Sequence, residues 1–204
     1  MTILFSFVNG GQVFQCATWE HLENLKNYHD IVSIDCSENF LVVLPTLPIS
    51  LIHLNCSDNK LTVIPTLPSL LEYLCCSYNL LSVVPTLPLR LTHLYCSNNK
   101  LTVLPTLPNS VSSLYCSNNL LAFLPKFRDS LEYNYYDNNP VDTFIREKCG
   151  GDLEIYYYDT EIYANKLVHW YLNCRENPKF KFCRDRLDRE YDALMEEDSC
   201  GLIS

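Results

Sequence analysis

The sequence repeats itself every twenty residues, and this period constrains the fold more than any other feature. The word CSNN at residues 96–99 returns at residues 116–119, and a cysteine stands at the same phase at Cys36, Cys56, Cys76, Cys96 and Cys116. An asparagine follows three residues after each cysteine, and a leucine two residues later. A repeat this short cannot bury an apolar face alone, so neighbouring copies must stack and share one continuous core.

The first half of each unit, LxxLxC, alternates as a strand does, with Leu54 and Cys56 on one face and His53 and Asn55 on the other. Identical strands at a fixed offset predict a parallel sheet with neighbours about 4.8 Å apart. The second half contains PTLP. Because proline fixes φ and lacks an N–H, we expect this half to run as an extended, polyproline-like convex wall.

The asparagine column has a structural explanation. Turning from strand to wall leaves backbone groups buried, and an asparagine amide can satisfy both a donor and an acceptor. We therefore predict a buried ladder, and not a ligand site, at Asn39, Asn59, Asn79, Asn99, Asn119 and Asn139.

The full unit, LxxLxCSxNxLTxLPxLPxx, resembles the leucine-rich repeat, in the short form found in large nucleocytoplasmic DNA (giant) viruses and in bacterial effectors. The resemblance covers residues 31–140, more than half of the chain. It implies an α/β solenoid with a parallel β-sheet on its concave face. It also implies a non-enzymatic protein-protein interaction module that binds a host or viral protein.

The eleven cysteines favour core packing over chemistry. Five stand where leucine-rich repeats place an inward apolar residue, and a thiol buries readily as a small hydrophobe. The chain has no CxxC pair of the kind that zinc sites use, and Cys75 and Cys76 are adjacent, so they should point to opposite faces. An odd count also argues against a fully paired secreted framework. We expect no metal, no cofactor and a reducing compartment.

Charge and hydropathy exclude other classes. A formal net charge of −9 argues against nucleic-acid binding, which requires a basic surface. No apolar run reaches the roughly twenty residues of a membrane span. The start, MTILFSFVNGG, lacks the basic region of a signal peptide. We therefore predict an intracellular protein, located in the host cytoplasm or in the virion.

The two ends are predicted to cap the solenoid. In residues 1–30 we expect a hairpin of strands 2–7 and 12–16 followed by a helix after Thr18. The second strand should open the parallel sheet, because Phe14 and Cys16 lie one period before Ile34 and Cys36. Residues 141–204 should form a helical cap whose first helix covers 142–148. The charged helix 178–198 is basic first and acidic last, which fits either a solvated surface or an acidic partner.

Function should reside on the outward strand positions that the repeat does not dictate. They form two columns of side chains, and we predict a Tyr-rich binding surface centred on Tyr95 and Tyr115, because tyrosine is enriched at protein interfaces. The alternative is that the tyrosines only stabilise the sheet by cross-strand contact. The predicted binding residues are His53, Tyr73, His93, Tyr95, Tyr115, Tyr133 and Tyr135.

Two other functions are alternatives to a protein-protein interaction module. Some bacterial effectors that carry this repeat add a ubiquitin-ligase domain with a Cys-x-Asp motif, and Cys183-Arg184-Asp185 matches those letters. However, Cys183 falls on a predicted apolar helix face, and a reactive cysteine should be exposed, so we expect no catalytic residue. A structural protein of a virion is the other alternative. Self-association through the Tyr-rich face or the last helix is also open.

Overall fold

The computed structural model describes residues 2–7, 12–125, 127, 131–149, 151, 153 and 156–157. The chain divides into two compact units, Met1–Lys148 and Cys149–Ser204. The first unit holds every strand and helix whose bounds follow. The helices predicted in the last forty or so residues, with Cys183-Arg184-Asp185, lie outside the described residues.

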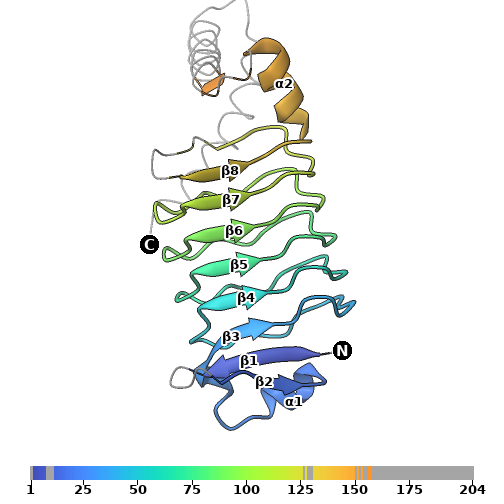
Figure 1. Ribbon diagram of the computed structural model, residues 1–204, viewed down its shortest axis with the longest axis vertical. Helices are drawn as coiled ribbons and strands as arrows, with labels where there is room; N and C mark the ends of the chain where they lie inside the picture. The colour runs from blue at the N-terminus through green and yellow to red at the C-terminus, as the bar shows by residue number, and fades with distance from the viewer. Residues whose placement is uncertain are drawn as a thin grey trace, which may run out of the picture. The chain divides into compact units, whose positions relative to one another are not determined.

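The first unit is built on a sheet of eight strands in the order β2-β1-β3-β4-β5-β6-β7-β8 (Figure 1). From β3 onward all neighbours are parallel, and each pairing joins residues twenty positions apart, such as Ser33 with His53 and Leu54 with Leu74. The twenty-residue period is therefore the register of the sheet. The strands are β1 (Ile3–Phe7), β2 (Phe14–Cys16), β3 (Ile31–Asp35), β4 (His53–Asn55), β5 (Tyr73–Cys75), β6 (His93–Tyr95), β7 (Ser113–Tyr115) and β8 (Tyr133–Tyr135).

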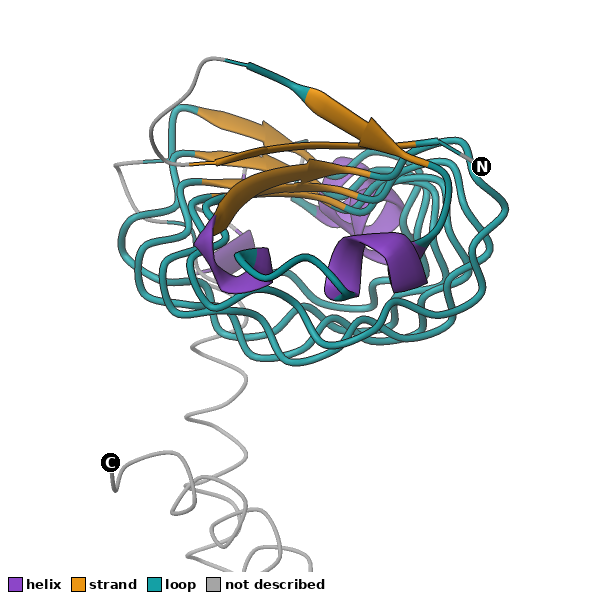
Figure 2. Cartoon of the chain, turned by 90° about the horizontal axis from the view of Figure 1, so that it is seen from below, coloured by secondary structure: helices purple, strands orange, loops and turns teal. Residues whose placement is uncertain are grey.

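The core lies between the sheet and the return segments, which Figure 2 shows on the opposite side of the unit from the strands. Leu54, Leu74 and Leu94 are fully buried, and so are the cysteines two residues after them. The return segments add further buried leucines such as Leu61 and Leu81, and their described residues form neither helix nor strand. The inward direction predicted for the cysteine column is confirmed, because Cys36, Cys56, Cys76, Cys96 and Cys116 are all buried.

The asparagine ladder is confirmed from Asn59 to Asn139, whereas Asn39 is half-buried and exchanges its bonds with the backbone of Thr2. The Asn79 side-chain oxygen accepts a bond of 2.9 Å from the Leu61 N–H, and its amide donates to the carbonyls of Cys56 at 2.9 Å and Cys76 at 3.1 Å. Asn59, Asn99, Asn119 and Asn139 repeat this pattern one coil at a time. Each asparagine side chain thus bonds its own coil to the preceding one, which explains why the asparagine of the repeat recurs every twenty residues.

The N-terminal end differs from the prediction. β2 does not open the parallel sheet: β1 lies between β2 and β3 and is antiparallel to both. The physical reason is burial, because Ile3 and Phe5 of β1 supply the alternating apolar side chains that continue the core. Phe14 of β2, at the sheet edge, remains 38% exposed.

The two helices of the first unit are short. α1 (Trp19–Glu23) begins after Thr18, whose hydroxyl accepts a bond from the His21 N–H, as predicted. It ends earlier than the apolar spacing predicts, and the 3₁₀ turn η1 (Tyr28–Asp30) leads into β3. At the other end, α2 (Pro140–Lys148) follows β8 and contains the helix predicted from residue 142.

Candidate functional site: an aromatic face on the sheet

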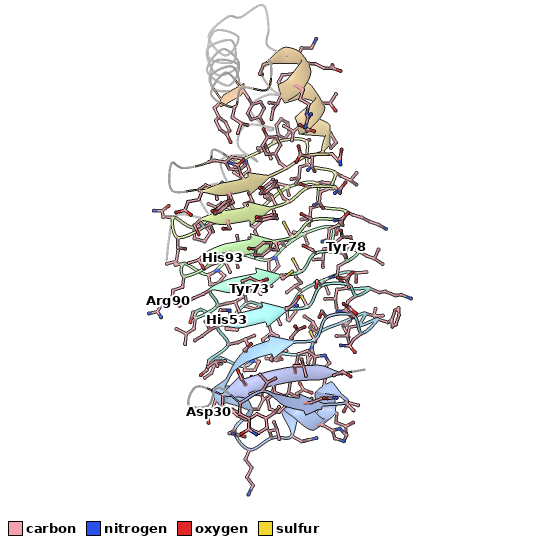
Figure 3. The ribbon with its side chains drawn as sticks, in the orientation of Figure 1. Asp30, His53, Tyr73, Tyr78, Arg90 and His93 are labelled. Carbon is pink, nitrogen blue, oxygen red and sulfur yellow. The ribbon has the colours of Figure 1, made fainter. Side chains whose placement is uncertain are left out.

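The face of the sheet that points away from the core, hereafter the outer sheet face, carries two side chains from each strand. The first column comes from strand starts, and Figure 3 shows His53, Tyr73 and His93 one above another on β4, β5 and β6. Their rings are neighbours, with centroids 5.9 Å apart for His53 and Tyr73 and 6.0 Å apart for Tyr73 and His93. The parallel register, which aligns equivalent residues, brings these rings together.

The second column, from strand ends, becomes a stack of tyrosines. The ring centroids of Tyr95 and Tyr115 are 4.7 Å apart and those of Tyr115 and Tyr135 are 4.6 Å apart, both stacked. Tyr73 joins the two columns, because its ring centroid lies 5.3 Å from that of Tyr95. Six of the seven predicted residues therefore form one continuous aromatic surface. Tyr133 is 52% exposed, and no ring contact is found for it within the described part of the chain.

The hydroxyls of Tyr73 and Tyr95 are neutral donors and acceptors. Burial, with smaller effects from the neighbouring Cys75 and Tyr95, raises the pKa of Tyr73 to about 12. Burial also raises the pKa of Tyr95, with a smaller effect from Tyr115. These two side chains therefore offer apolar rings with polar tips that carry no charge at neutral pH.

A residue that the sequence did not single out orients His93. The Thr92 hydroxyl lies 2.9 Å from the Glu72 carbonyl oxygen and 2.8 Å from His93 Nδ1. Because a hydroxyl has one proton and the carbonyl can only accept, the arrangement that satisfies both contacts has Nδ1–H donating to Thr92. The Nε2 atom of the neutral ring is then an acceptor. Thr92 could have been found only once the register had placed it beside His93 and Glu72.

The second column changes chemistry along its length. Asp35 accepts bonds from the backbone N–H and the hydroxyl of Ser37 at 3.0 and 2.7 Å, and Asn55 donates to its second oxygen at 3.1 Å. Cys75 is half-buried between Asn55 and Tyr95. In the first column Ser113 is buried and offers no outward surface. The column thus runs from a carboxylate at β3 to a tyrosine stack at β6–β8.

The thiols of the core remain protonated and are poor nucleophiles. Burial raises the pKa of Cys36 and of Cys116 to about 12, with a further contribution from Asp35 and Asp137 respectively. Within the residues that the structure describes, no group of three or more His, Cys, Asp or Glu side chains is placed to hold a metal ion. In the same residues, no helix has the length and apolar character that crossing a bilayer requires.

The comparisons with known proteins find similarity in solved structures. A Shigella effector LRR domain matches with a TM-score of 0.52 and 34% identity, over 52% of this chain and 49% of that one. YopM from Yersinia enterocolitica matches with a TM-score of 0.52 and 36% identity, over 54% of this chain and 25% of that one. This chain therefore spans about half, or less, of the length of the proteins it resembles. No family model and no curated protein matches the sequence.

These matches and the parallel register agree on the architecture. The repeats form a leucine-rich-repeat solenoid. At 34–36% identity the likeness concerns sequence as well as backbone, and the Shigella neighbour is described as an effector LRR domain. What those proteins bind is not a property that the likeness transfers to this chain.

Proposed function

We propose that this protein is a non-enzymatic protein-protein interaction module and that its outer sheet face binds the partner. The observation that carries the proposal is the continuous surface of six aromatic rings from His53 to Tyr135 on the side of the sheet away from the core. Tyr135 is 46% exposed, and tyrosine gives large contact area at low cost in side-chain entropy. The likeness to a Shigella effector LRR domain supports the same class of function.

Stacking alone does not account for the face. Cross-strand aromatic pairs contribute about 0.5–1.5 kcal/mol each beyond their buried area, so the ladder also stabilises the sheet. Yet a stabilising ladder needs only neighbouring rings, whereas Tyr133 is half exposed without a ring neighbour in the described chain. The two roles are compatible, and the binding role predicts an effect on a partner that stability alone does not.

The remaining architecture fits a rigid platform. We propose three segments: an N-terminal cap at 1–30, the repeats at 31–140 and a C-terminal helical cap at 141–204. In the repeats, the PTLP segments would form an extended convex wall that holds the sheet in shape. Burial of Trp19 and Leu22 beside the first strands supports the N-terminal cap. We place the chain with the short LPxLP repeats of giant viruses, acting in the host cytoplasm on a host or viral protein.

The test is affinity capture from host cells with wild-type protein and a Tyr95→Ala/Tyr115→Ala variant. We expect the partner to be lost while far-UV circular dichroism is retained. A matched control, Tyr78→Ala/Phe123→Ala, removes two exposed aromatic side chains that lie off the outer sheet face and should capture the partner normally. Equal capture by the wild type and the Tyr95/Tyr115 variant would contradict the proposal.

Three alternatives make different predictions. A structural virion protein would be abundant in purified particles, whereas a binder directed at the host would be abundant in infected cytoplasm. A ubiquitin-ligase-like effector would form a reducible adduct with ubiquitin that disappears in Cys183→Ala. Self-association through the tyrosines would appear as a dimer in sedimentation that the double tyrosine variant abolishes.

A further inference from the structure

Charge in the repeats is sorted by position. Residues 31–140 contain seven acidic and five basic side chains. Each repeat has an eight-residue strand segment, which begins at residue 31 and recurs every twenty residues as 51–58, 71–78 and so on to 131–138. Six of the seven acidic residues lie in these segments, namely Asp35, Glu38, Asp58, Glu72, Glu132 and Asp137. None of the five basic residues does; these are Lys60, Arg90, Lys100, Lys126 and Arg128. The strand segments that frame the aromatic face therefore carry carboxylates and neither lysine nor arginine.

Among the described residues, no ion pair is found for Asp35, Glu38, Asp58, Glu72 or Glu132. The ion pairs of this part of the chain are formed by Arg146, which binds Asp137 and Asp142 at 2.8 and 2.7 Å. Glu72 and Glu132 directly precede Tyr73 and Tyr133 at the strand starts. The frame therefore keeps most of its negative charge.

Lys60 and Arg90 lie in turns outside the strands. Lys60 lies over the ring of Phe40 with its Nζ 5.3 Å from the centroid, in the turn that follows the strand end. Arg90 is exposed in the turn before β6, and Figure 3 shows it beyond the strand starts. An unpaired acidic frame around an aromatic surface is complementary to a cation, which ring faces attract and carboxylates bind.

At its β3 end, the second column borders a pocket that is lined by negatively charged side chains. Asp35 and Glu38 line it together with Thr2 and Leu4 at the β3 end of the sheet. At the strand starts, the Nε2 acceptor of His93 adds a site for an N–H donor. From β3 to β8 the column spans five strand steps, about 24 Å, which an extended peptide of about eight residues covers.

We propose that the occupant of the outer sheet face is an extended peptide segment rich in lysine and arginine. This inference rests on the proposed function and specifies its partner by chemistry. The tyrosines contact the cationic side chains through their ring faces, Asp35, Glu72 and Glu132 pair with them, and His93 Nε2 accepts a hydrogen bond from a guanidinium or ammonium group. The partner is thus a protein with a basic, unstructured or strand-like segment.

The test measures binding of fluorescent peptides of about ten residues. The full chain is titrated against an alternating Arg–Ser peptide, with Glu–Ser and Gln–Ser peptides of equal length as references. We expect the Arg–Ser peptide to bind at least tenfold more tightly than either reference. Equal binding of the three peptides would overturn the inference.

A charge variant then locates the site. Asp35→Asn/Glu72→Gln/Glu132→Gln removes one carboxylate of the second column and the two that directly precede Tyr73 and Tyr133. Asn at position 35 keeps the two bonds from Ser37, since Asn55 binds Ser57 in the same way, and loses the bond that Asn55 donates to Asp35. We expect about tenfold weaker binding of the Arg–Ser peptide. The matched control, Glu20→Gln/Glu23→Gln/Glu147→Gln, changes the formal net charge of −9 by the same three units on the two helices. An equal loss in the control would show unspecific attraction and overturn the inference.

The ring contribution is tested separately. Tyr95→Leu/Tyr115→Leu keeps apolar bulk but removes the ring faces, so the Arg–Ser peptide should bind about fivefold more weakly. Tyr95→Phe/Tyr115→Phe keeps the rings and should bind as the wild type does.

Failure of this inference can be distinguished from failure of the proposed function. If the alanine variant loses its cellular partner but the charge variant keeps it and the Arg–Ser peptide does not bind, the binding face stands and its basic ligand does not.

Discussion

The buried asparagine Asn79 satisfies backbone groups of two successive coils. It accepts from the Leu61 N–H and donates to the carbonyls of Cys56 and Cys76. Asn59 and Asn99 also donate to these two carbonyls, so the loss of Asn79 leaves one buried N–H without a partner and each carbonyl with one bond fewer. We expect Asn79→Ala to lower the free energy of unfolding by about 2 kcal/mol, measured by urea denaturation. Asn109→Ala, in an exposed turn, is the control and should be neutral. A loss of less than about 1 kcal/mol at Asn79 would show that water replaces the amide.

The residue before each ladder asparagine has a left-handed backbone. Asn98, Asn118 and Asn138 suit this conformation, with φ near 56°, but the same position holds Tyr78 with φ 55°. Because Tyr78 is 56% exposed, replacing it loses little packing. We expect Tyr78→Asn to raise the free energy of unfolding by about 1 kcal/mol. The converse exchange, Asn98→Tyr, should lower it by a similar amount, and the same sign for both would refute the explanation.

At the scale of the strand, successive side chains point to opposite faces of the sheet, and this separates the neighbouring thiols of Cys75 and Cys76. Cys76 is fully buried and burial raises its pKa well above the usual range, whereas Cys75 is partly exposed on the outer sheet face. We expect brief treatment with iodoacetamide at mildly alkaline pH to label Cys75 and leave Cys76 intact, as read by peptide mass spectrometry. Labelling in urea, where both thiols should react, is the control. Equal labelling of both in the folded protein would mean that the strand faces are misassigned.

The elements that could be predicted from sequence are those that the period repeats. Leu54, Cys56 and Asn59 recur in the coils of β4 to β7, so stacking fixes their direction, and the parallel register follows. The placement of β1 could not be predicted, because a strand that occurs once has no register to copy, and its burial through Ile3 and Phe5 decides its neighbours. At the site, the period placed Tyr95 beside Tyr115. The contacts of Thr92 required the bond geometry itself, because threonine is not repeated at that position.

At the scale of the whole molecule, periodicity makes the coils interchangeable. The bonds of one coil to the next repeat with an offset of twenty residues: Leu61 N–H donates to Asn79 as Leu81 N–H donates to Asn99. What differs between coils is the outer sheet face, where the residue type at the second column changes from Asp35 to Tyr135. The core therefore specifies the scaffold, and the outward residues are free to specify the partner.

Interchangeable coils predict that one whole unit can be removed. Deleting residues 61–80 joins Lys60 to Leu81, so that Leu81 N–H still donates to Asn99 and Asn59 still bonds within its own coil. We expect a folded, soluble protein with a cooperative urea transition at a lower midpoint, because one interface between coils is lost. Deleting residues 61–70 is the control: it cuts the unit in half, destroys the register and should abolish the transition.

The whole-unit deletion also bears on binding. It removes Tyr73 but leaves the stack of Tyr95, Tyr115 and Tyr135, so it should still capture the partner. Aggregation of the whole-unit deletion would show that the coils are not equivalent.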